Sequence, residues 1–73
     1  MKSYLVLWFN SEGKNPGEIT RRLTSIGFRP AKGNYDYIYD WDNKATTEDA
    51  IKLADRVQQS LKGCNVSFKI ETL

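Results

Sequence analysis

SYLVLWFN, residues 3–10, is the stretch that decides the fold. Its aromatic and branched residues favour a β-strand, and almost every position is apolar. We therefore expect both faces of this strand to be covered, as in the centre of a sheet. Because side chains alternate along a strand, one face carries Leu5, Leu7 and Phe9. The other face carries Tyr4, Val6 and Trp8.

Two amphipathic helices are predicted in the sequence that follows this strand. The first begins after the N-cap Asn15, with Pro16 at its first position, and ends at Gly27. Its expected buried stripe is Ile19, Leu23 and Ile26. The second helix is capped by Thr46 or Thr47 and ends at Gly63. Its expected apolar face is Ala50, Ile51, Ala54, Val57 and Leu61.

Three more strands are expected, at residues 28–31, 35–41 and 66–73. The order β-α-β-β-α-β, with a very short second strand, predicts one ferredoxin-like α+β domain over residues 1–73. Both helices then cover one face of an antiparallel sheet. In the last strand, the helix side is expected to carry Val66, Phe68 and Ile70, and the open side Ser67, Lys69 and Glu71.

Residues 35–41 alternate between aromatic and mostly acidic side chains. The aromatic set is Tyr35, Tyr37, Tyr39 and Trp41, and the opposite set is Asp36, Ile38, Asp40 and Asp42. Burying aspartates under the helices would cost too much free energy, so we expect the aromatic set to face the core. A bulge in the strand would reverse this arrangement locally.

The composition excludes several kinds of site within one chain. The sequence has 73 residues, a single cysteine (Cys64) and no histidine. A Cys/His zinc site, a Cys–His dyad and a Ser-His-Asp triad are therefore impossible, and Cys64 is expected to be a buried, inert thiol. The longest apolar run, residues 4–9, is too short to cross a membrane, and no signal-peptide pattern is present. We expect a cytoplasmic protein with no cofactor and no catalytic activity.

The open face of the sheet is the predicted binding surface. An uncovered central strand would expose a large apolar patch, which monomers usually avoid. We therefore expect a homodimer in which this face packs on a second copy, with any small-molecule effector at the interface. The residues assigned to this surface are Tyr4, Val6, Trp8 and Lys69. The expected function is that of a small binding or regulatory module.

Charged residues suggest two alternatives. Residues 1–33 have a net charge of +4 and residues 34–73 a net charge of −2. A nucleic-acid-binding module would use the sheet aromatics with a basic cluster formed by Arg21, Arg22, Arg29 and Lys32. A metal-dependent hydrolase would use Asp36, Asp40 and Asp42. Of these, Asp40 and Asp42 would lie about 7 Å apart on one strand face, a spacing that suits a divalent cation. The favoured interpretation of these aspartates is a solvated strand end.

Parts of this sequence resemble three families. KGNYDYIY at residues 32–39 and NVSFKIETL at residues 65–73 resemble the Gly-x-Tyr-Asp and terminal Glu-Thr strands of GYD-type domains. A similar pattern occurs in the RAM domains of leucine-responsive (Lrp/AsnC-type) regulators. The resemblance to GYD-type and RAM domains implies a dimeric ferredoxin-like fold, and RAM domains bind small effectors between subunits. The first strand and Lys32-Gly33 also resemble the aromatic motifs of RNA-recognition domains.

Overall fold

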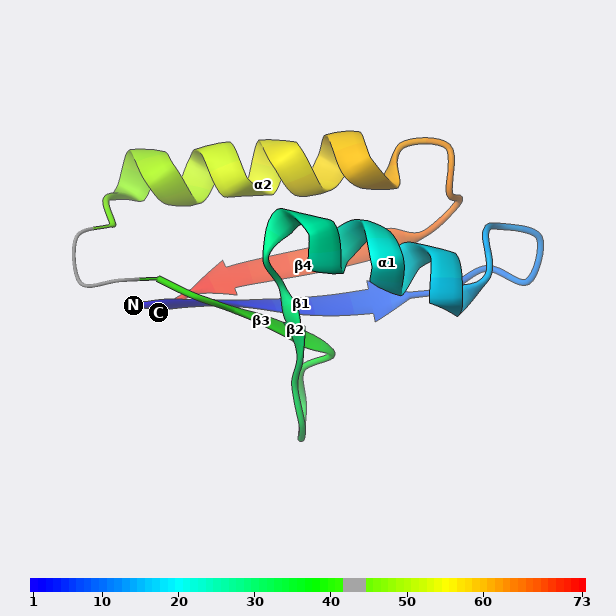
Figure 1. Cartoon of the computed structure of the whole chain (residues 1–73), viewed down its shortest axis with the longest axis horizontal. Coiled ribbons are helices and arrows are strands. Elements are labelled where there is room, and N and C mark those ends of the chain that lie inside the picture. Colours follow the sequence, from blue (N-terminus) through cyan, green and yellow to red (C-terminus); the bar gives the residue numbers. More distant parts are fainter. Residues whose placement is uncertain (42–44) are drawn as a thin grey trace.

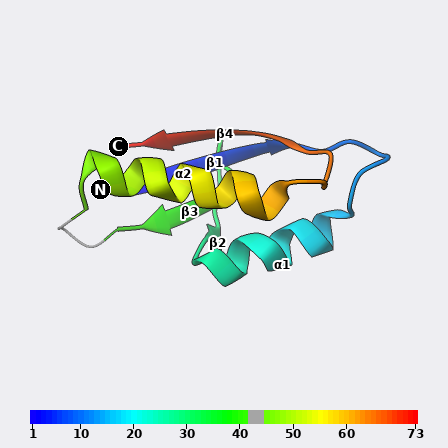
Figure 2. The ribbon, with the colours of Figure 1, turned by 90° about the horizontal axis from the view of Figure 1, so that it is seen from above.

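The computed structural model describes residues 1–41 and 45–73, and its elements follow the predicted order (Figure 1). In chain order they are β1 (Lys2–Trp8), α1 (Pro16–Ile26), β2 (Arg29–Pro30), β3 (Tyr37–Asp40), α2 (Thr47–Leu61) and β4 (Ser67–Thr72). All strand pairs are antiparallel, and the strands form one sheet in the order β2-β3-β1-β4. Both helices lie on the same face of that sheet (Figures 1 and 2). This topology confirms the ferredoxin-like α+β prediction.

The predicted N-caps of both helices and the predicted end of α1 are present, whereas α2 ends at Leu61, with Lys62 as its C-cap, before the predicted Gly63. Asn15 Oδ1 accepts the Glu18 N–H at 2.8 Å, and Gly27 ends α1 with a φ of 120°. Thr46 caps α2 in a reciprocal pair with Asp49, because each side chain accepts the other's backbone N–H. The backbone N–H of Thr46, donating to the carboxylate, lowers the pKa of Asp49. These caps satisfy backbone groups that a helix end leaves unpaired.

The core lies between the helices and the sheet, and it corrects the predicted apolar face of α2, which included Ile51 and omitted Leu53. Leu53 is 2% exposed and Val57 is fully buried, whereas Ile51 is 59% exposed. Residues 53, 57 and 61 share one helix face, and Ile51 points about 200° away from Leu53 on the 3.6-residue repeat. Placing Ile51 on the buried face was therefore wrong. The core residues are Leu5, Leu7, Ile19, Leu23, Phe28, Tyr37, Leu53, Val57, Leu61 and Cys64.

The first strand is shorter than predicted. β1 ends at Trp8, which lies opposite Ser67 at the beginning of β4. Phe9 follows the strand and is 48% exposed, so the prediction that it continues the strand face of Leu5 and Leu7 was wrong. The alternation holds up to that point, because Leu5 and Leu7 are buried while Trp8 is exposed on the opposite face.

The third strand begins later than predicted because its first residues bulge. Tyr37 lies opposite Leu5, but the backbone N–H of Asp36 also donates to the Leu5 carbonyl at 2.9 Å. Two consecutive residues therefore face one residue of β1, which is the arrangement of a β-bulge. The bulge turns Tyr35 to the open face, so its assignment to the core was wrong. Tyr37 is buried, and Tyr39 and Trp41 pack against the core as expected.

Asp36 also replaces a missing strand contact. Its Oδ2 accepts the backbone N–H of Leu7 at 2.8 Å, beyond the last residue of β1 that pairs with β3. The side chain thus continues the hydrogen bonding of the sheet where the backbone of residues 31–35 turns away from it. In Figure 1 this segment extends from the sheet on the side opposite the helices.

Candidate binding surface

The open sheet face is built from β1, β3 and β4. Register places Tyr4 between Ile38 on β3 and Glu71 on β4, and Val6 beside Lys69. Residues directly opposite in a sheet share a face, so these side chains lie on the side without helices. This is the placement predicted for Tyr4, Val6, Trp8 and Lys69.

Part of this face is covered by the chain itself. The rings of Tyr35 and Tyr4 lie with their centroids 4.5 Å apart, and Tyr4 is only partly exposed. The Tyr35 hydroxyl donates to Glu71 Oε2 at 3.1 Å, which holds the ring over Tyr4. The uncovered apolar patch is therefore smaller than the sequence suggests. It is concentrated at the end of β1, where Trp8 is 55% exposed.

A charged network lies beside the tyrosine pair. Lys69 Nζ is 2.9 Å from Glu71 Oε1, and the other oxygen of Glu71 receives the Tyr35 hydroxyl. Lys69, and secondly Tyr35, hold the pKa of Glu71 below its usual value. The same contacts with Glu71 raise the pKa of Lys69 and of Tyr35. All three groups are solvent-accessible, so the network orders the surface more than it stabilises the fold.

The four cations of the basic cluster do not lie on one surface. Arg21 and Arg22 are on α1, in the helix layer, where both approach Glu18 and Arg22 also donates to the Ser60 carbonyl. Arg29 is on the opposite side of the sheet from the helices, since it pairs in register with Ile38. Lys32 lies in the segment between β2 and β3.

Of the aspartates considered for a metal site, Asp36 and Asp40 are described by the structure. Asp36 accepts the Leu7 backbone N–H, and Asp40 lies 3.8 Å from Arg29. Asp42 falls outside the described residues. Within residues 1–41 and 45–73, no three His, Cys, Asp or Glu side chains group closely enough to hold a metal ion.

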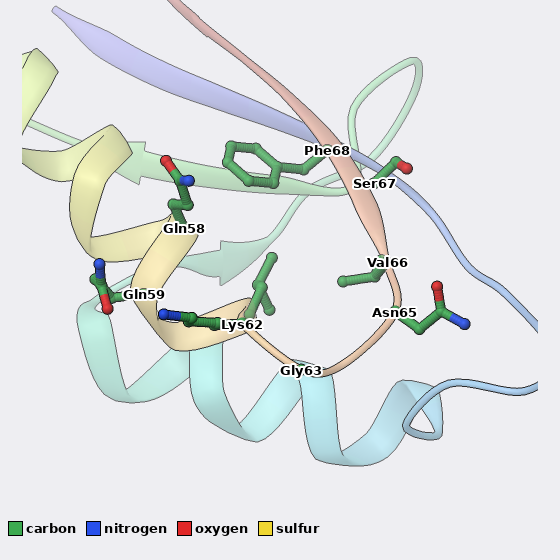
Figure 3. Close-up of a pocket in the computed structure, with 9 residues that line it drawn as sticks. Gln58, Gln59, Lys62, Gly63, Asn65, Val66, Ser67 and Phe68 are labelled. Carbon is green, nitrogen blue, oxygen red and sulfur yellow. The ribbon is translucent and has the colours of Figure 1, made fainter.

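A hollow of about 360 Å³ separates the C-terminal turn of α2 from the start of β4. Figure 3 shows Val66 and Phe68 pointing toward the helix across this hollow, with Gln58 on the opposite wall. Lys62 is the charged residue that lines it, and the other polar groups are amides and a hydroxyl. These groups can donate and accept hydrogen bonds, but they do not include a nucleophile paired with a general base. Sequence reasoning did not identify this hollow, since it depends on the distance that the fold leaves between the end of α2 and the edge strand β4.

Comparison with known proteins adds no assignment. No family model, no curated protein and no solved structure matches this chain. Within the part of the chain that the structure describes, no helix is long and apolar enough to cross a membrane.

Proposed function

We propose that this domain is a small, non-catalytic binding or regulatory module whose open sheet face packs on a second copy of the chain. The observation that carries the proposal is the exposure of Trp8 on the open face at the end of β1. A large aromatic residue on a central strand gains most from burial when a second sheet covers it. A small effector would then bind at the rim of this interface, near Lys69.

Two further arguments support this proposal. Residues 32–39 and 65–73 resemble GYD-type and RAM domains, which are dimeric. A domain of 73 residues also buries only a modest share of its surface, so its core contributes little stability. Association with a second copy would add to that stability. The proposal includes a cytoplasmic location, in keeping with Cys64 as a buried free thiol.

The test is the solution mass of a Trp8→Glu variant, measured by light scattering over a range of concentrations. A carboxylate at this position would have to be desolvated in the interface, so we expect the mass to fall by half relative to the unmodified protein. Ile51→Glu is the matched control, because Ile51 is equally exposed but lies on α2 in the helix layer. If Trp8→Glu stays folded by circular dichroism and keeps the mass of the unmodified protein, the open face is not an interface.

A further inference from the structure

β4 is an edge strand with free backbone groups. The strand order places β1 on one side of β4 and no strand of the described sheet on the other. Lys2 and Leu73 exchange both backbone hydrogen bonds, each at 2.9 Å. Because antiparallel pairs alternate between bonded and non-bonded positions, Glu71, Lys69 and Ser67 also bond to β1. The N–H and C=O groups of Phe68, Ile70 and Thr72 therefore point outward from the sheet.

The helix layer leaves room beside this edge. In Figure 2, α2 runs over the middle of the sheet and not over β4. Phe68 and Ile70 lie on the helix side of β4, and both remain partly exposed although they are apolar. The hollow between β4 and the end of α2 adjoins the same edge (Figure 3). A strand added here would complete the backbone hydrogen bonding and cover both side chains.

We infer that the β4 edge pairs with the β4 edge of a second copy, antiparallel and centred on Ile70. In this register Ile70 lies opposite the partner's Ile70, and Phe68 opposite the partner's Thr72. On the open face, Lys69 then lies directly opposite the partner's Glu71, and Glu71 opposite the partner's Lys69. Opposite charges at such positions stabilise strand pairing.

Charge selects this register over its neighbours. Moving the two-fold axis by one residue toward the N-terminus places Lys69 opposite the partner's Lys69. Moving it by one residue toward the C-terminus places Glu71 opposite the partner's Glu71. Like charges directly opposite each other destabilise a strand pair. Centring on Ile70 pairs residues 68–72 of β4 with the same residues of the partner, whereas shifts of two or more residues shorten the paired segment.

The resulting assembly has one sheet running through both copies, with all helices on the same side. Its two-fold axis is perpendicular to the sheet, so it uses a different surface from the open-face contact around Trp8. The inference therefore does not rest on the proposed function.

The first test is amide hydrogen exchange of the unmodified protein, followed residue by residue by NMR at low and high concentration. We expect the amides of Phe68, Ile70 and Thr72 to become protected as concentration rises, because pairing removes them from water. The amides of Lys69 and Glu71 are the internal control, since they bond to β1 at every concentration. Packing through the open face alone would leave the three outward amides unprotected, so exchange distinguishes the two contacts.

The second test is a mixing experiment with Lys69→Glu and Glu71→Lys. Each variant alone places like charges opposite one another, and we expect both to lose the concentration-dependent protection. An equimolar mixture places opposite charges across the edge, so the protection should return in a mixed pair. If the single variants instead lost protection because the Lys69–Glu71 contact within each chain is broken, mixing them would not restore it. Outward amides that exchange freely at every concentration would overturn the inference and leave the edge open to a different partner. Unchanged protection in the single variants would overturn the proposed register.

Discussion

Replacing Asp36 with alanine should destabilise the fold more than its exposed position suggests. The Asp36 carboxylate accepts the N–H of Leu7 at 2.8 Å, and Leu7 is only 7% exposed. A hydrogen bond from a buried backbone group to a charged acceptor contributes about 1.5–3 kcal/mol. We therefore expect Asp36→Ala to lower the free energy of unfolding by about 2 kcal/mol. For a domain of this size, that corresponds to a fall in Tm of about 8–16 °C.

Urea denaturation followed by circular dichroism measures this loss. With a slope of about 1 kcal/mol per molar urea, the midpoint should fall by about 2 M. Asp36→Asn keeps an oxygen acceptor without the charge and should lose about half as much. Asp40→Ala is the matched control, because Asp40 lies at the end of β3, four residues after Asp36, and its contact with Arg29 is exposed. Its cost should stay below about 1 kcal/mol. Equal losses in Asp36→Ala and Asp40→Ala would refute a structural role for the Leu7 contact.

Three further changes test the packing, one turn and the charged network. Leu53→Ala should cost about 2–5 kcal/mol while Ile51→Ala costs less than about 0.5 kcal/mol, and similar urea midpoints for the two variants would contradict the assigned helix face. Gly27→Ala should destabilise the protein more than Gly33→Ala in thermal melts, because a Cβ at Gly27 would lie 2.9 Å from the Tyr39 ring whereas one at Gly33 meets nothing within 4 Å. Because the pKa of Glu71 is lowered in the fold, its contribution to stability is present above its unfolded pKa and is lost as the pH falls through the folded value. Lys69→Met should therefore reduce the loss of stability that sets in as the pH falls below the unfolded glutamate pKa of about 4.3, and an unchanged pH dependence would argue against the network.

The helices were predictable because their ends depend on local residues. Asn15, Pro16 and Gly27 act on backbone groups within one turn, so their roles follow from the sequence alone. The central position of β1 was predictable for a similar reason, since its continuous apolar pattern is typical of a strand in the middle of a sheet. The wrong placement of Ile51 shows that a broad apolar pattern does not by itself determine which of two adjacent helix faces is buried.

The bulge at Asp36 could not be predicted from alternation. The strict pattern of residues 35–41 favours a regular strand, but the hydrogen bonds to Leu5 and Leu7 depend on where β1 runs. As a result, the stacking of Tyr35 on Tyr4 was missed, and so was the part of the open face that it covers. Glu71 was assigned to the correct face by alternation, but its contacts with Tyr35 and Lys69 become visible only in the sheet.

The central place of β1 has a consequence for the order in which this protein folds. Ser3 lies opposite Thr72, and the two hydroxyls are 2.7 Å apart, so the first and last strands are direct neighbours. Contacts between such distant residues require the closure of a long loop and slow the folding of a small domain. On the ribosome, one side of β1 stays unpaired until β4 has left the exit tunnel. We therefore expect the helices to form early and the sheet to close as the last, rate-limiting step.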